Sequence, residues 1–421
     1  MKKHLHILLF FLAVAPALYA QTANDLVKQA IEKEKNNDNQ GAIADCTTAL
    51  QSDPQNAWAY NIRGNAKIKL GLDADAIADF DRSIALSPKY GDAFGNRGVA
   101  KSDLGRYADA IADYDEAIAI NANNKVNYSN RGSAKHFLGR DAEAITDCNQ
   151  AIALDPNFSK AFSNRGMAKQ SLGNYTEARA DFDQAITLDS YNSEAYYNRG
   201  TLNINLKNYA EAVPDLDRSI TLDPKFAVAY NNRAYSKYKL GNYADAIADC
   251  NQAIALAPRM ATAYDVRGDA ENRAERYADA VRDFDQTIAL GYNNAEVYYS
   301  RGFAKSNLGE YAAAVADLDQ AITLDPDYAL AHYCRGEAKI NLGLYTDAIA
   351  DYTEVITFAP KFAYAYTYRG YAYYKLGGTK ENYQKAIEDY DMGIQLGGSN
   401  YTPPFKYRDE AVAAMNKTTG L

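Results

Sequence analysis

Two columns of charged residues are the most regular candidates for chemistry in this chain of 421 residues. An arginine recurs at every 34th position without a change of register, and an aspartate recurs with nearly the same spacing. In most units a lysine follows the arginine by four residues, so the two cations repel each other on one helix. We therefore predict that a carboxylate from a facing helix pairs with them; the alternative is a charged track for a ligand. The arginines are Arg63, Arg97, Arg131, Arg165, Arg199, Arg233, Arg267, Arg301, Arg335 and Arg369; the lysines are Lys67, Lys101, Lys135, Lys169, Lys237, Lys305 and Lys339; the aspartates are Asp45, Asp79, Asp113, Asp147, Asp181, Asp215, Asp249, Asp283, Asp317, Asp351 and Asp389.

Residues typical of enzyme active sites do not converge in this sequence. His136 and His332 lie far apart, and each is interpreted as a packing or groove residue rather than a base or metal ligand. Cys46, Cys148 and Cys250 occupy a column that other units fill with an aromatic residue, so they are predicted to be core spacers. Because all four cysteines lie in separate units, we expect four unpaired thiols. The sequence therefore predicts no catalytic residues, no metal and no cofactor.

The elements that must position these columns are pairs of amphipathic helices. The unit 93–120, for example, reads as two helices joined at Gly105, where glycine adopts a left-handed turn without strain. An alanine column in the second helix lets the helices pack closely, and prolines mark where each second helix ends. The alanines are Ala42, Ala76, Ala110, Ala144, Ala178, Ala212, Ala246, Ala280, Ala314, Ala348 and Ala386; the prolines are Pro54, Pro88, Pro156, Pro224, Pro258, Pro326 and Pro360.

A period of 34 with aromatic-x3-Gly, Ala-x3-aromatic and a closing proline resembles the tetratricopeptide repeat. The resemblance covers roughly residues 23–400 and about eleven units, and it implies an all-α, right-handed superhelical solenoid with a C-terminal capping helix. It further implies an N-terminal capping repeat at 23–56, ten repeats at 57–400 and the capping helix at 401–421. The arginine and lysine columns depart from the family pattern, because the family has apolar and aromatic residues there.

The N-terminus and the charge bear on location and partners. Met1–Ala20 has two lysines, an apolar run and small residues at its end, which is typical of a secretory signal peptide. Its removal would leave 43 basic and 54 acidic residues, a net charge of −11. We therefore expect an exported protein, periplasmic or secreted, with no transmembrane segment and no nucleic-acid partner.

In this architecture the first helix of each unit lines the concave face, so its inner side is the candidate site. One column there holds five amides in consecutive units, each offering a donor and an acceptor to the backbone of an extended peptide. We expect these amides to be solvated groove residues that bind the backbone of the partner. The alternative is that they bind no partner and only hydrate the groove or cap a neighbouring helix. The amides are Asn96, Asn130, Asn164, Asn198 and Asn232.

Aromatic rings replace the amides on the inner side of the last units. Tyrosine supplies contact area at a low cost in conformational entropy, so these rings are candidates for binding a protein or peptide. Packing between close helices and stacking on a sugar are the alternatives. The residues are Tyr299, Phe303, Tyr333, Tyr364, Tyr368, Tyr371 and Tyr374.

The sequence thus predicts a non-enzymatic scaffold that binds a protein or an extended peptide in its groove, in the cell envelope. Two alternatives remain: a scaffold for polysaccharide export or envelope assembly that contacts glycan, and an adaptor subunit of an enzyme complex.

Overall fold

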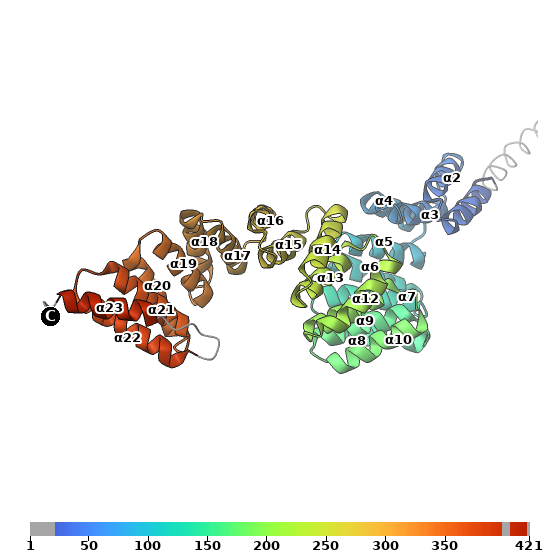
Figure 1. The fold of residues 1–421 in the computed structure, drawn as a ribbon. Helices are drawn as coiled ribbons and strands as arrows, with labels where there is room; N and C mark the ends of the chain where they lie inside the picture. Colours follow the sequence, from blue (N-terminus) through green and yellow to red (C-terminus); the bar gives the residue numbers. More distant parts are fainter. Residues whose placement is uncertain (1–21, 398–404, 419–421) are drawn as a thin grey trace, which may run out of the picture. The chain divides into compact units, whose positions relative to one another are not determined.

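The computed structural model describes residues 22–397 and 405–418, and every regular element in these ranges is an α-helix (Figure 1). The segment 1–20, in which we predicted a signal peptide, lies outside them. The chain divides into two compact units, one up to Leu202 and one from Asn203. The all-α solenoid of tandem helix-turn-helix repeats that the sequence predicted is confirmed.

Each repeat contributes a first and a second helix. The first repeat pairs a helix at 22–35 with α2 (Asn39–Ser52). The first helices that follow are α3 (Ala57–Ile68), α5 (Gly91–Asp103), α7 (Lys125–Phe137), α9 (Ser159–Ser171), α11 (Ser193–Asn205), α13 (Ala227–Lys239), α15 (Ala261–Arg273), α17 (Ala295–Asn307), α19 (Ala329–Asn341) and α21 (Ala363–Leu376). The second helices are α4 (Asp73–Leu86), α6 (Tyr107–Ile120), α8 (Asp141–Leu154), α10 (Tyr175–Leu188), α12 (Tyr209–Leu222), α14 (Tyr243–Leu256), α16 (Tyr277–Ala289), α18 (Tyr311–Leu324), α20 (Tyr345–Phe358) and α22 (Lys380–Leu396); a last helix, α23 (Phe405–Thr418), packs on α22 and α21.

Small residues set the spacing of the two helices within a repeat. The alanine column is fully buried, and Ala178 faces α9 with no exposed surface. A Cβ at Gly166 would lie 2.6 Å from the ring of Phe182, so only glycine lets α9 approach this ring. Gly173 ends the first helix at φ +80°, in the left-handed region that glycine adopts without strain. The glycine and alanine columns therefore serve packing and turns.

Contacts between successive repeats define an inner face in each unit. In the first unit α3 contacts α5, α5 contacts α7, and α7 contacts α9; in the second unit the same holds from α13 to α21. Among the described residues, second helices of successive repeats make no such contacts. Because the elements on the inside of a curved stack lie closest together, the first helices form the inner face.

Candidate functional site

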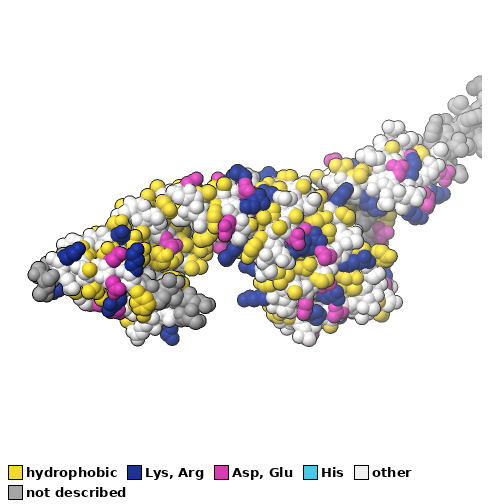
Figure 2. All heavy atoms as spheres, viewed as in Figure 1, with side chains coloured by type: hydrophobic (Ala, Val, Ile, Leu, Met, Phe, Trp, Pro, Cys, Tyr) yellow, Lys and Arg dark blue, Asp and Glu magenta, His cyan; other side chains and the backbone are white. Residues whose placement is uncertain are grey.

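The charged columns form ion pairs inside and between repeats. Asp181 is 4% exposed and accepts hydrogen bonds from Arg165 Nε at 2.9 Å and Nη2 at 2.6 Å, while Lys169 Nζ lies 2.9 Å from it. The third arginine nitrogen, Nη1, reaches back to Asn149 of the preceding second helix at 2.6 Å. Similar arrangements recur along the chain, and Figure 2 shows cations and anions interspersed on the visible face.

These pairs confirm the predicted contact between the facing helices and add a second one, between repeats. The arginine also stacks on an aromatic ring of its own helix, as Arg165 does on Phe162 at 5.2 Å from the ring centroid. The hydrogen bond to Asp79 raises the pKa of Arg63, so this arginine stays charged at neutral pH. Arginines with two facing partners and a ring beneath them hold successive repeats together.

The asparagine column also connects repeats. Asn164 Nδ2 donates to the carbonyl oxygen and the hydroxyl of Ser129 at 3.1 and 3.0 Å, and Asn198 Nδ2 donates to Ser163 Oγ at 3.1 Å. Asn96 Nδ2 donates to Asn61 Oδ1 at 3.1 Å. In each case the acceptor belongs to the first helix of the preceding repeat.

Burial corrects one expectation for this column. Asn130, Asn164 and Asn198 are buried, and Asn164 is only 3% exposed, so these amides are not solvated groove residues. Asn96 and Asn232 are partly buried. The acceptors Asn61, Ser129 and Ser163 lie in the interior of their helices, so these hydrogen bonds join neighbouring helices and are not helix caps. A role of the column in holding a partner stays a prediction.

The predicted aromatic residues divide into two groups. Tyr371 and Tyr374 lie against α23: the ring of Tyr371 is 5.2 Å from that of Tyr407, and Tyr374 donates to Glu410 at 3.2 Å. Tyr364 is 39% exposed and lies 6.0 Å from the ring of Phe362. The first two residues thus hold the C-terminal helix in place.

Tyr299, Phe303, Tyr333 and Tyr368 form the second group, on the inner face of α17, α19 and α21. The ring of Tyr299 lies 5.1 Å from that of Tyr328, and Tyr333 contacts Tyr368 edge to face at 5.8 Å. All four are partly buried, so each keeps some surface for a partner. Their role in binding stays a prediction.

Carboxylates beside these rings were missed by the sequence analysis. Asp265 and Asp269 on α15 and Glu337 on α19 occupy columns that hold uncharged residues in the other units, and this departure was the available signal. Burial, with a smaller contribution from the charges of Asp269 and Glu296, raises the pKa of Asp265 to about 7. Burial likewise raises the pKa of Asp269 to about 6. We call Asp265, Asp269 and Glu296, with the rings of Tyr299 and Tyr328, the acidic-aromatic surface.

The two histidines have structural partners, and the four cysteines are buried. His136 Nδ1 lies 2.6 Å from Asp141, and His332 Nε2 lies 3.0 Å from the carbonyl oxygen of Pro326. The four thiols are free and buried, which confirms that they are unpaired, and burial raises the pKa of Cys46 to about 12. Within residues 22–397 and 405–418, no three potential metal ligands converge.

No helix in the described part of the chain has both the length and the apolar character needed to cross a bilayer.

Several sequence families match the chain. Sequence models described as "Tetratricopeptide repeat" match residues 27–91, 91–124, 127–158, 164–225, 227–260 and 335–400, and one described as "TPR repeat" matches 306–343. No significant match was found among curated proteins.

Solved structures of similar fold include three with low sequence identity. YrrB, described as a TPR protein with an unusual peptide-binding site, is 24% identical over 47% of this chain and 97% of its own, with a TM-score of 0.41. A tetratricopeptide repeat protein from Parabacteroides merdae is 21% identical over 68% of this chain and 99% of its own, with a TM-score of 0.40. A chain of the APC/C hetero-tetramer Cut9-Hcn1 is 13% identical over 95% of this chain and 99% of its own, with a TM-score of 0.47. The family matches extend over well more than half of the sequence, and the chain belongs to the tetratricopeptide repeat family.

Proposed function

We propose that this protein is a non-enzymatic scaffold that binds a protein or an extended peptide on its inner face. The observation that carries the proposal is the acidic-aromatic surface of the second unit. Rings and carboxylates there lie on consecutive first helices, α15 and α17, and on the turn before α19. Such a row offers both apolar contact and charge to an extended chain.

The charges on this surface favour a cationic segment as the partner. Burial first, and then the negative charges nearby, raise the pKa of Asp265 and of Asp269, and a cation nearby would favour the ionised form of both carboxylates. Lys239 and Arg273 lie near Asp269, and their positive charges already favour its ionised form. Lys239 also lies 5.1 and 5.0 Å from the rings of Tyr235 and Tyr238, so rings of α13 already receive a cation from the chain itself.

Replacing Asp265 and Asp269 together by asparagine is expected to weaken binding of a cationic peptide by roughly tenfold or more, because two charge-assisted contacts are lost. The probe is an acetylated Lys-Arg-Lys-Arg amide, titrated calorimetrically. Binding should also strengthen between pH 6 and pH 8, because Asp265, whose pKa is about 7, loses its proton in that window.

As the pH rises through the pKa of Asp265, the stability of the folded protein should fall while binding of the cationic peptide strengthens. The pKa of Asp265 is raised in the folded protein, so its contribution to stability is lost as the pH rises through about 7. Asp265→Asn should therefore raise the melting temperature at pH 8 while it weakens binding. Asp347→Asn, an exposed change on α20, is the control and should alter neither. Equal binding by an acetylated tetraglutamate would contradict a cationic partner, and capture of envelope polysaccharide by the rings would favour the glycan alternative.

Export is the second part of the proposal, and the pattern of Met1–Ala20 supports it. Expression of the full chain in a bacterium with an outer membrane should give a mature protein that begins at Gln21 and is released with the periplasmic contents. Replacing Leu8 and Leu9 by arginine should retain the uncleaved chain in the cytoplasm. N-terminal sequencing of both fractions is the measurement, and an intact N-terminus in the wild-type protein would contradict export.

A further inference from the structure

One repeat reverses a charge that eight other repeats keep. In those eight, the lysine Nζ lies 2.6 to 2.9 Å from the aspartate of the second helix. In the repeat of α15 and α16 the corresponding residue is Glu271. The aspartate, Asp283, is kept, and Arg267 donates two hydrogen bonds to it, at 2.6 and 2.7 Å. The ammonium group of the other repeats has no counterpart within this one.

Glu271 is deeply buried and incompletely paired. It is 4% exposed; one carboxylate oxygen lies 3.2 Å from Arg276 Nη2, and the other, Oε2, is buried without a hydrogen-bond partner. Arg276 is shared, because it also donates to Asp279 at 2.9 and 2.6 Å. A buried carboxylate oxygen without a donor is costly, and a ligand with N–H groups would supply one.

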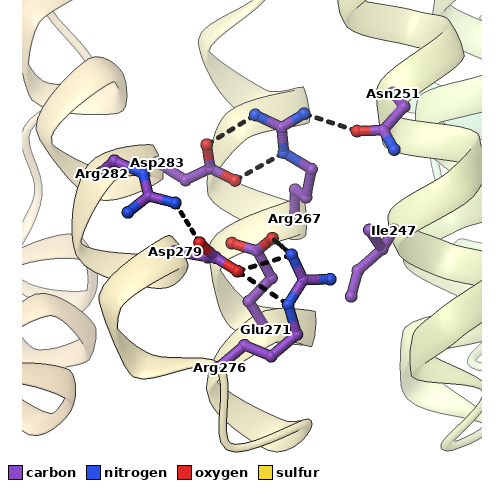
Figure 3. A pocket seen from close by; sticks show the side chains of 8 residues that line it. All are labelled: Ile247, Asn251, Arg267, Glu271, Arg276, Asp279, Arg282 and Asp283. Carbon is purple, nitrogen blue, oxygen red and sulfur yellow. Dashed lines mark hydrogen bonds and ion pairs between the residues drawn. The ribbon is translucent and has the colours of Figure 1, made fainter.

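These groups surround a pocket of about 260 Å³ (Figure 3). Arg267 and Asp283 lie on one side of the view, with Asn251 beyond them, and Arg276 and Asp279 lie around Glu271. Arg282 is paired with Asp279, so each guanidinium of the pocket already has a carboxylate partner. Ile247 supplies an apolar wall.

We propose that this pocket binds a primary ammonium group, which enters between Glu271 and Asp283 in place of the missing lysine. The ammonium has three N–H donors, enough for the unpaired Oε2 and for Asp283, and its alkyl stem would contact Ile247. In eight other repeats a lysine nitrogen lies beside the equivalent aspartate. The donor is a lysine side chain of another protein or a free amine; the pocket is distinct from the acidic-aromatic surface, and its test is independent of that proposal.

The test uses the mature full-length protein and acetyl-lysine amide as the probe, followed by calorimetry and by NMR of the glutamate side chains. Wild-type protein should bind the probe, and Glu271→Gln should bind it at least about tenfold more weakly. Glu271→Lys should abolish binding and raise the melting temperature, because it restores the arrangement found in eight other repeats.

Glu275→Lys is the matched control. It makes the same change of charge four residues away, at an exposed turn position with φ 58°, and should leave binding and stability near the wild-type values. If Glu275→Lys lost as much binding as Glu271→Lys, the net charge of the protein would explain the effect without the pocket. That result would overturn the proposal.

Further probes identify the source of the ammonium group and the need for its N–H donors. A lysine-containing peptide that binds more tightly than putrescine indicates a protein partner, and the reverse order indicates a free amine. Tetramethylammonium has the charge without N–H donors and should not bind. Equal binding of tetramethylammonium, or a lower melting temperature for Glu271→Lys, would overturn the proposal.

Discussion

Replacing Asp181 with asparagine is expected to lower the free energy of unfolding by about 3 kcal/mol, because two cations are left in a mostly buried site. Asp181 accepts two hydrogen bonds from Arg165 and contacts Lys169 at 2.9 Å. An asparagine offers one neutral oxygen in place of two charged ones. Thermal unfolding and hydrogen exchange of α9 and α10 are the measurements, since a repeat array can open locally rather than all at once.

Asp183→Asn provides the comparison within the same helix. Asp183 is also paired with an arginine, Arg199 at 2.6 Å, but its side chain is 49% exposed. Surface pairs of this kind contribute within about 1 kcal/mol, so Asp183→Asn should have a small effect. Equal effects of the two substitutions would contradict the structural role of the buried column. If Asp181→Asn instead weakened partner binding at unchanged stability, the ligand-track alternative would be favoured.

Tyr352 gives the second large expected effect. Its side chain is fully buried on α20, and its ring contacts Tyr333 at 5.8 Å and Tyr368 at 5.9 Å. Tyr352→Ala should cost about 3 to 5 kcal/mol, because the ring is lost and a cavity is left. The aromatic contacts on the inner face of α19 and α21 would loosen with it.

The hydroxyl of Tyr352, unlike its ring, is expected to lower the stability of the folded protein. Its oxygen is buried without a hydrogen-bond partner, so Tyr352→Phe is expected to stabilise the protein by up to about 1 kcal/mol. Tyr114 occupies the same column, but its hydroxyl lies 3.3 Å from Ser102 Oγ. Tyr114→Phe should therefore cost about 1 kcal/mol. The sign difference between these two matched substitutions is the measurement, and a loss of stability in both would show that the Tyr352 hydroxyl has a partner.

The two proposed sites have a common origin in departures from the repeat. Asp265, Asp269 and Glu271 all lie on α15, where most other repeats have uncharged residues or a lysine. A repeat that only maintained the stack would keep the lysine, since the buried aspartate is retained. Residues that reduce stability in this way are characteristic of functional sites.

The sequence by itself determined the succession of paired helices, the turns between them and the family. These features depend on local spacing: a column of alanines marks one helix face, a glycine ends a helix, and a fixed period means that each unit meets the next in the same way. The pairing of Arg165 with Asp181 could be predicted for the same reason, because opposite charges recur in register.

Only the tertiary structure decided which side chains remain available to a partner. Asn164 was predicted to be solvated, yet it donates to Ser129 of the preceding repeat, and Tyr371 packs on Tyr407 of the last helix. In the fold Glu271 is a buried carboxylate near Asp283, where eight other repeats have a lysine. Local spacing fixes which face of a helix a residue occupies. The partners that satisfy or leave unsatisfied its polar atoms come from neighbouring helices, whose positions only the packed repeats define.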